Sequence, residues 1–276
     1  MMSPFRFVPL VAVAVLLAAP ARAQAPTVEQ VLKASLDQSL AAFNTGDFEG
    51  YLHDFAPQLD YNGLRVDRAR LVDINKELRD SFKNLSMKYE RIRVNTISPD
   101  EAAATTVTEF SGSTTNYDNS GLAATYRETG QVTALYKRAG ERWTTGLLDV
   151  AWNDSYIDIG QNFGAIGFST LPTLGGTKQP YRFRLFVGED ERPGFGVAYA
   201  YTTAPLKNVI EKAGAEEVFK QLQFKPVPTE GVEAEFHGPD TPGTYAHVLV
   251  INKYWKAGNN ESIVGQKIYT RLMRVE

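Results

Sequence analysis

The sequence predicts an α+β protein: an N-terminal cone-shaped α+β barrel, with helices packed in a curved antiparallel sheet, followed by a second small α+β domain. Three observations predict this class. Apolar residues recur at helical spacing as far as Phe82, alternate residues are apolar from Met87 onward, and a helical period returns near Leu206. A sheet that follows its helices has to curl over them to bury their apolar faces.

The first 23 residues have the three parts of a cleavable secretory signal peptide. Arg6 supplies positive charge, residues 8–19 are apolar apart from Pro9, and Ala21 and Ala23 give the small-x-small cleavage pattern. The apolar run is shorter than the roughly 20 residues that a membrane-spanning helix needs. We therefore expect cleavage after Ala23 and export to a periplasm or the extracellular space. An N-terminal membrane anchor is the alternative.

The composition limits the classes of partner and cofactor. The chain has no cysteine, which excludes disulfides and thiolate metal sites. Loss of Arg6 and Arg22 with the signal would move the formal net charge from −3 to about −5, and no basic run remains. This argues against nucleic acid as a partner and against a membrane after cleavage. None of the three histidines has a partner at metal-ligand spacing, so we expect no metal and no cofactor.

The first helix is expected to begin at Val28. Thr27 and Gln30 have the spacing of a capping box, in which the threonine caps the helix and the glutamine bonds back. Apolar residues follow on a helical period as far as Phe43. The sequence Asn44-Thr45-Gly46-Asp47 then interrupts the helix and can cap the next one.

A second and a third helix are expected before the sheet. Four apolar residues at positions i, i+3, i+4 and i+7 predict the second helix: Phe48, Tyr51, Leu52 and Phe55. Pro57 is expected to end it, and a short strand over 58–61 leads to a turn at Asn62-Gly63. The third helix is expected to begin near Asp67 and to run to Phe82.

Long strands follow, separated by turn sequences. The extended segments are expected over residues 87–97, 103–115, 123–138 and 142–153. We expect these elements to complete a first domain over residues 27–155.

This first half resembles a known superfamily in three places. They are the Phe43–Asp47 junction, the sequence His53-Asp54-Phe55 and the late hairpin Tyr136–Trp143. On these motifs residues 27–155 resemble the nuclear transport factor 2-like superfamily, in particular its SnoaL-like branch. The resemblance implies a cone with a pocket that opens between the sheet and the helices. It does not name a function, because members of the superfamily include isomerases, cyclases, dehydratases and non-catalytic binding domains.

The second half is expected to be a separate small domain over residues 178–276, of no family that we recognise. Residues 156–177 are rich in glycine but also apolar, which predicts a linker or a packed loop. The expected order beyond them is two strands, two helical segments and three strands, with the strands over 181–187, 195–201, 232–236, 245–254 and 262–275.

Two carboxylates are candidate catalytic residues. Glu128 shares strand parity with Tyr126, and Asp149 shares parity with Trp143. If these faces point inward, loss of solvent would raise the pKa of each acid and suit it to proton transfer. The alternative is a bulge, for example at Gly130 or Gly146, which would turn the acid to water.

Other candidates are one histidine and a set of aromatic residues. His53 could act as a general base, or it could be a surface histidine beside Asp54. Five aromatic residues are expected to line a ligand cavity, although such residues more often belong to a core: Tyr51, Phe55, Tyr61, Tyr126 and Trp143. The superfamily resemblance implies that Tyr51, Phe55 and Tyr61 face the cavity.

Taken together, these features favour an exported, non-catalytic protein that binds a small apolar or amphipathic ligand in the cone, or binds a protein partner. One alternative is an enzyme of the isomerase or dehydratase type, with Glu128 or Asp149 as general base and a tyrosine such as Tyr61 as donor. Another is an assembly protein that acts as a homodimer. The strand from Ala123 would present a mixed polar outer face, which permits a homodimer without requiring one.

Overall fold

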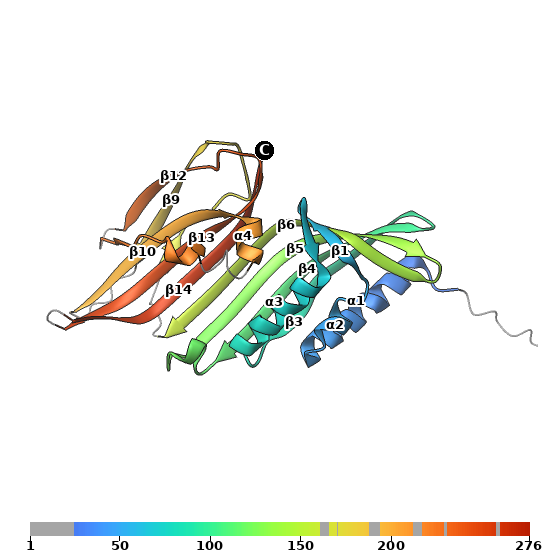
Figure 1. The fold of residues 1–276 in the computed structure, drawn as a ribbon, viewed down its shortest axis with the longest axis horizontal. Coiled ribbons are helices and arrows are strands. Elements are labelled where there is room, and N and C mark those ends of the chain that lie inside the picture. Colours follow the sequence, from blue (N-terminus) through green and yellow to red (C-terminus); the bar gives the residue numbers. More distant parts are fainter. Residues whose placement is uncertain are drawn as a thin grey trace, which may run out of the picture.

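The computed structural model describes residues 25–160, 166–169, 171–187, 194–211, 217–228, 231–257 and 260–276. In these ranges the protein is α+β, with one large, mainly antiparallel sheet, a three-stranded sheet and few helices (Figure 1). The expected signal peptide lies outside the described residues. Among the helices that are described, none combines the length and the apolar character needed to cross a bilayer.

Helix α1 (Val28–Thr45) begins and ends where the sequence predicts. The Thr27 side chain accepts a hydrogen bond from the backbone N–H of Gln30 (3.2 Å), and Gln30 Oε1 accepts from the Thr27 N–H (2.9 Å). The helix ends at Gly46, whose φ of 87° lies in the left-handed region that favours glycine.

The second helix is shorter than expected. Helix α2 covers only Phe48–Tyr51, and Phe55 begins strand β1 (Phe55–Tyr61) instead of continuing the helix. The reason is tertiary pairing: the Asp54 carbonyl accepts from the Thr145 N–H (2.8 Å), and β1 runs parallel to strand β6 from there. Strand β2 (Leu64–Asp67), which pairs with β1, was not predicted.

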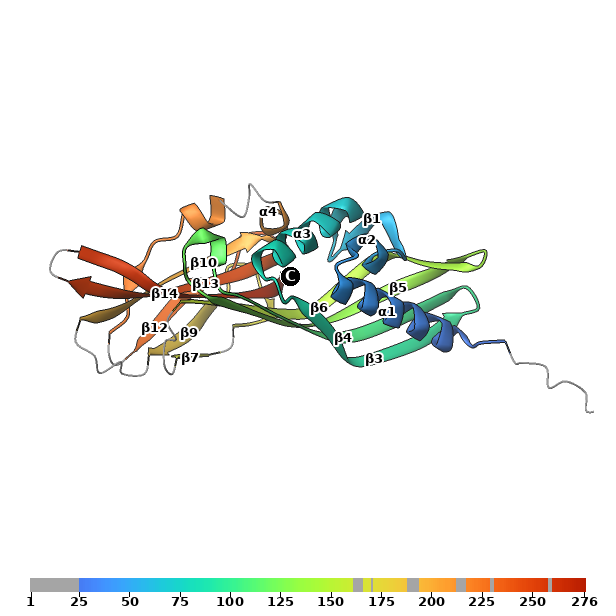
Figure 2. The same cartoon turned by 90° about the horizontal axis from the view of Figure 1, so that it is seen from below.

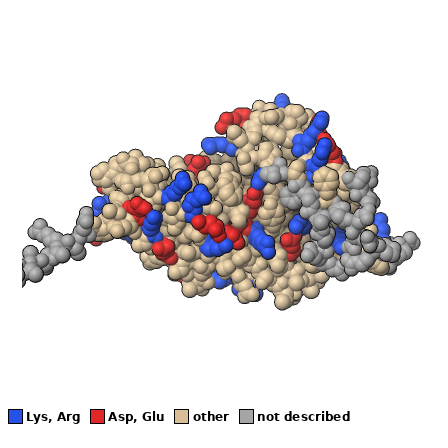
Figure 3. Space-filling model, turned by 180° about the vertical axis from the view of Figure 1, so that it is seen from behind, with Lys and Arg blue, Asp and Glu red and all other residues tan. Residues whose placement is uncertain are grey.

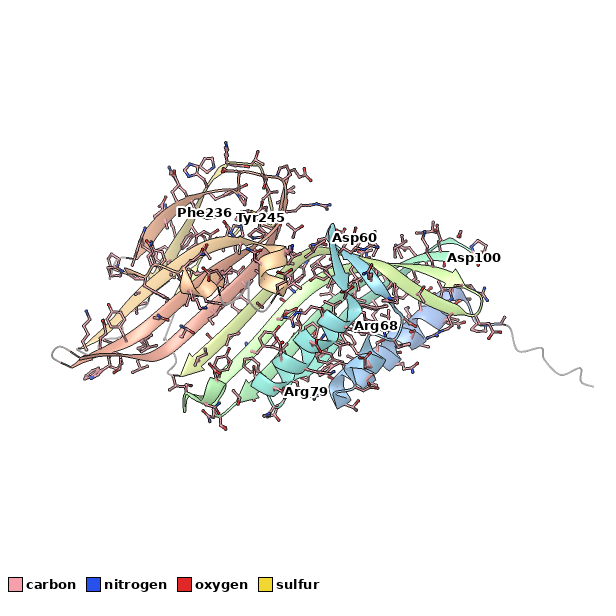
Figure 4. All side chains as sticks on the ribbon, in the orientation of Figure 1. Asp60, Arg68, Arg79, Asp100, Phe236 and Tyr245 are labelled. Carbon is pink, nitrogen blue, oxygen red and sulfur yellow. The ribbon has the colours of Figure 1, made fainter. Side chains whose placement is uncertain are left out.

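Helix α3 (Arg68–Ser81) is held against the end of α1 by Arg79 (Figure 4). Its guanidinium donates to the carbonyls of Phe43 (3.2 Å), Asn44 (3.1 Å) and Leu85 (3.2 Å). The last carbonyls of a helix have no partner within the helix, so this arginine satisfies two of them and adds a favourable positive charge.

Four long strands form an antiparallel meander, as the period of two predicts. They are β3 (Ser86–Ser98), β4 (Glu101–Thr114), β5 (Ala124–Ala139) and β6 (Arg142–Gly160), with a short 3₁₀ turn η1 (Tyr117–Asn119) between β4 and β5. We call the face of this sheet that α1–α3 cover the inner face, and the opposite one the outer face. The inner face holds two clusters of buried residues, one around Phe43 and Phe82 and one around Leu32 and Trp143.

Strand β6 continues seven residues beyond its expected end at Asn153. Asp154–Gly160 pair with β5 on one side and with β14 (Asn260–Val275) on the other. The main sheet then continues through β13 (Gly243–Ala257), β10 (Phe195–Pro205) and β11 (Lys225–Pro226), while β8 (Leu174–Gly175) pairs with β14. One sheet therefore runs through both halves of the chain, and their division into two domains stays a prediction.

Both faces of the second half are covered. Figure 2 shows α4 (Leu206–Ile210) on the same side of the sheet as α3, and the small sheet on the other side. The small sheet comprises β7 (Ile166–Phe168), β9 (Pro180–Val187) and β12 (Val232–His237). Phe183 and Leu185 of β9 pack against Leu249 and Ile251 of β13. The two halves also touch directly, because Arg70 Nε donates to the carbonyl of Ile210 (2.9 Å).

A buried ion pair joins β6 to β14 on the outer face. The Arg271 guanidinium binds both carboxylate oxygens of Asp154, each at 2.5 Å, and donates to the Leu171 carbonyl at 2.5 Å. The two side chains are only 12% and 13% exposed. Tyr269 also donates to Asp154 (2.9 Å), so the carboxylate keeps three protein donors in place of water.

We expect Arg271→Met to lower the free energy of unfolding by about 3 kcal/mol, because Asp154 would remain buried without its cation. Lys267→Met is the matched control in the same strand. Its partner Asp158 is 47% exposed, so the expected loss is about 0.5 kcal/mol. Urea unfolding of both variants measures the difference, and equal losses would contradict the role of the Asp154–Arg271 pair.

His247 is fully buried between the main sheet and the small sheet. The Tyr201 hydroxyl bonds Nδ1, the Met273 sulfur lies 3.0 Å from Nε2, and the ring of Phe236 packs against the imidazole at 5.3 Å. Burial, together with the positive charge of Arg271, lowers the pKa of His247 to about 4.

This shift makes stability depend on pH. Between the ordinary pKa of 6.5 and about 4, the unfolded chain binds a proton at His247 and the folded chain does not. The free energy of unfolding therefore decreases as the pH is lowered through that window, and this residue accounts for about 1.4 kcal/mol per pH unit. His247→Gln lacks this pH-dependent contribution. The difference in free energy of unfolding between the unaltered protein and this variant should therefore shrink by about 3 kcal/mol when the pH is lowered from 7 to 4. Exposed His237→Gln is the control, and a difference for His247→Gln that is constant with pH would contradict the prediction.

Candidate functional site

Glu128 lies on the inner face of β5, inside the helix-covered part of the sheet. Residues alternate along this strand, so Tyr126 and Glu128 point inward while Arg127 points outward. The Glu128 carboxylate accepts one hydrogen bond from the Tyr126 hydroxyl and one from Asn153 Nδ2 (2.7 Å). The parity of β5 thus places a carboxyl group among apolar and aromatic side chains.

The surroundings shift the pKa of Glu128 and of the phenols near it. Loss of solvent raises the pKa of Glu128, and the hydrogen bonds from Tyr126 and Asn153 oppose this rise in part. Burial, and then the negative charge of Glu128, raise the pKa values of Tyr51, Tyr61 and Tyr126. All three phenols therefore stay protonated at neutral pH and can donate hydrogen bonds.

Five tyrosines and Glu128 make up what we call the tyrosine cluster. The tyrosines come from α2, β1, β3 and β5, and burial raises the pKa of each: Tyr51, Tyr61, Tyr89, Tyr126 and Tyr136. Their hydroxyls are near enough to interact electrostatically, Tyr89 with Tyr51 and Tyr136, and Tyr136 with Asp54. Tyr51, Tyr61, Tyr89 and Glu128 are only partly buried, so accessible surface remains beside them.

The cluster has the chemistry of a site for an oxygenated organic molecule. Aromatic rings offer apolar contact area, the phenols offer donors, and the carboxyl of Glu128 offers an acceptor or, when protonated, a donor. Within the described residues no group of three or more histidine, aspartate or glutamate side chains is placed to hold a metal ion.

The five expected cavity residues divide between this cluster and the core. Tyr51, Tyr61 and Tyr126 belong to the cluster; Tyr51 packs edge-on against Phe43 (5.1 Å), and Tyr126 stacks on Phe82 (5.3 Å). Phe55 is partly buried and contacts both inner clusters. Trp143 is 6% exposed and packs with Leu32, Leu36 and Leu59 in the other core cluster, away from Tyr126.

Asp149 does not reach the inner face. Leu147 pairs with Leu135 and Thr145 pairs with Tyr136, which leaves Gly146 as the extra residue of a bulge. The bulge reverses the parity of β6, so the Asp149 side chain is 53% exposed. The inward placement considered for Asp149 is therefore wrong, for the reason that the bulge alternative gives.

His53 joins helix α1 to the start of β1. Its Nε2 lies 3.1 Å from Asp54 Oδ1 and 3.3 Å from Ser35 Oγ, and its Nδ1 lies 2.7 Å from the Gly50 carbonyl. Ser35 also donates to Asp54. Both ring nitrogens contact these neighbours, and none of these contacts joins His53 to Glu128.

Sequence reasoning missed Asn153 as part of the site. A second irregularity in β6 explains why: Gln131 pairs with Trp152 and Val132 pairs with Val150, which leaves Ala151 unpaired. Beyond it the odd-numbered residues of β6 face inward, and Asn153 faces Glu128. No sequence signal marks this bulge, because Ala151 lies between Val150 and Trp152, which are typical strand residues, with no glycine or proline beside it.

Comparison with known proteins finds similarity in structure only. No protein-family model matches the chain, and no curated protein matches it in sequence. Solved structures that resemble part of it include Bd1075 of Bdellovibrio bacteriovorus (13% identity, TM-score 0.34), with 44% of this chain and 40% of that chain covered. Two others are an NTF2-like protein of unknown function in nutrient uptake from Rhodospirillum rubrum (18%, TM-score 0.34; 43% and 95% covered) and an NTF2-like superfamily protein from Salmonella enterica (11%, TM-score 0.36; 44% and 88% covered).

The proteins from Rhodospirillum rubrum and Salmonella enterica are both described as NTF2-like, and the sequence of residues 27–155 resembles that superfamily. The similarity covers less than half of this chain. At these identities and TM-scores it supports no inference about activity, ligand or partner.

We expect Tyr126→Phe to raise the pKa of Glu128 further, because the Tyr126 hydroxyl stabilises the carboxylate form. A carbon-13 NMR titration of the glutamate side chains measures this pKa. Tyr117→Phe is the matched control, since the Tyr117 ring also packs on Phe82 (5.5 Å) while Asp118, and not Glu128, is the charge beside it. An unchanged or lowered pKa in Tyr126→Phe would contradict the geometry.

Proposed function

We propose that the inner face of the N-terminal half binds a small, largely apolar molecule that carries oxygen atoms, with Glu128 at the polar end of the site. The observation that supports this most is the partly buried carboxyl group, surrounded by protonated phenols and bonded to Tyr126 and Asn153. We also propose that this half forms a cone, in which a curved sheet surrounds α1–α3.

The cost of burial supports a functional role for Glu128. A carboxylate removed from water loses solvation that two hydrogen bonds restore only in part, as its raised pKa indicates. An apolar side chain of similar size at this position would stabilise the fold more. A ligand that donates a hydrogen bond to Glu128, or accepts one from a phenol, would offset this cost.

Proton transfer is the second candidate function. A carboxyl group with a raised pKa is a suitable general base or acid, and its negative charge raises the pKa of Tyr61 and Tyr51 as well as that of Tyr126, to which it is bonded. An isomerase- or dehydratase-type reaction would use Glu128 to move a proton and a tyrosine to donate to the substrate oxygen.

Three broader expectations remain part of the proposal. Export after cleavage at Ala23 is supported by the three-part pattern of the first 23 residues. A protein partner, or a homodimer through the outer face, is permitted by the mixture of acidic and basic side chains on the side of the molecule that Figure 3 shows.

The test is native mass spectrometry of the protein purified from its own host. We expect a small molecule bound at a ratio of one per chain, and we expect Glu128→Gln to reduce its occupancy by about tenfold, as loss of a charged hydrogen-bonding partner does. Tyr61→Phe should reduce it less. Any turnover of the identified molecule, abolished in Glu128→Gln, would favour the enzyme.

Asp149→Asn is the matched control, because it removes the same charge from the exposed side of the neighbouring strand. Its occupancy should equal that of the unaltered protein. Absence of a bound molecule, together with unchanged Tyr51 and Tyr61 resonances when a library of small aromatic carbonyl compounds is added, would overturn the proposal.

A further inference from the structure

A hollow lies at one end of the main sheet, and none of the tyrosine-cluster side chains lines it. Its walls are the end of β4, the start of β5 and the end of β6, with the turn between α3 and β3 at the rim. Its volume is about 600 Å³, which is within the range of pockets for small molecules.

Strand β5 separates this hollow from the tyrosine cluster by the alternation of its residues. Thr125 and Arg127 line the hollow on the outer face. Tyr126 and Glu128, their neighbours in the chain, point to the inner face. The two sites therefore share a strand but not their ligating side chains.

The charges of the lining favour an anion. Lys83 and Arg127 contribute two positive charges, and Asp158 contributes one negative charge. The carboxylate of Asp158 already pairs with Lys267 at 3.0 Å, so its charge is balanced locally. Lys83 and Arg127 thus make the hollow cationic in a chain whose net charge is −3.

The polar uncharged side chains of the lining are hydroxyl groups and the amide of Asn84. Ser113, Thr115 and Thr125 line the hollow from two adjacent strands and the start of the loop that follows β4. The Ser113 oxygen accepts from Asn84 Nδ2 at 3.4 Å, which leaves its own O–H to donate. Hydroxyls of this kind can bond both to an anion and to alcohol groups of a ligand.

We propose that this hollow binds a small hydroxylated organic anion, a carboxylate or a phosphate ester. Arg127 is the main anion-binding residue, because a guanidinium can bond two oxygens of one carboxylate or phosphate group at once. Lys83 adds a second positive charge at the rim, and Thr125 and Ser113 bond to the anion or to the hydroxyls beside it. The hollow is open to solvent, so binding weakens as the salt concentration rises.

Isothermal titration calorimetry of the full chain with citrate, inorganic phosphate and glycerol tests this proposal. We expect citrate or phosphate to bind with a Kd of about 1 mM or tighter at low salt, and glycerol, which has hydroxyls but no charge, to bind at least tenfold more weakly. Binding of citrate but not phosphate assigns the site to carboxylates, and the reverse assigns it to phosphate esters.

Arg127→Gln should weaken binding of the anion by about tenfold or more, and Thr125→Val by a few-fold. Arg142→Gln removes the same charge from the opposite end of β6, so it should leave the Kd unchanged. Glu128→Gln should also leave it unchanged, which separates this site from the tyrosine cluster. Absence of saturable binding, or equal affinities for the unaltered protein and Arg127→Gln, would overturn the proposal.

Discussion

The hydrogen bonding of one strand, β6, connects the two halves of this protein. Along its 19 residues β6 pairs with β5; β1 adds to its first part, and β14 adds to its last seven residues. At the join with β14 the Asp154–Arg271 pair replaces solvent with a bidentate contact and draws the Leu171 carbonyl onto the same guanidinium. If β6 ended at Asn153, only the two-residue strand β8 would pair with β14 on that side, and the sheet would divide in two.

The inner face depends on two small irregularities in the same strand. The bulge at Gly146 turns Asp149 outward, and the unpaired Ala151 turns Asn153 inward, toward Glu128. A strand whose side-chain period is two cannot otherwise place both Leu148 and Asn153 on one face. The polar contact of Glu128 with β6 is thus a result of backbone register and not of a sequence motif.

These irregularities also show how much could be predicted from the sequence. The capping box of α1, the limits of β3, β4 and β5, and most strands of the second half agree with the periodicity, because it reports directly which side chains are buried. The end of α2 and the strand β2 could not be predicted, since pairing of Asp54 with Thr145, distant in sequence, decides them. For the site, the parity of β5 predicts the inward position of Glu128 correctly. The parity of β6 fails at each bulge, because a bulge moves every residue that follows it to the other face.

The alternation of Tyr126, Arg127 and Glu128 also constrains how this gene can vary. Loss or gain of one codon within β5 after Glu128 would put the two parts of the strand out of phase, so that either Tyr126 and Glu128 or Ala134 and Tyr136 would turn to the opposite face. Changes of two codons would keep the parity but displace each contact by about 7 Å along the strand. Related genes should therefore vary in length in the loop between Thr114 and Ala124 and scarcely at all within the strand.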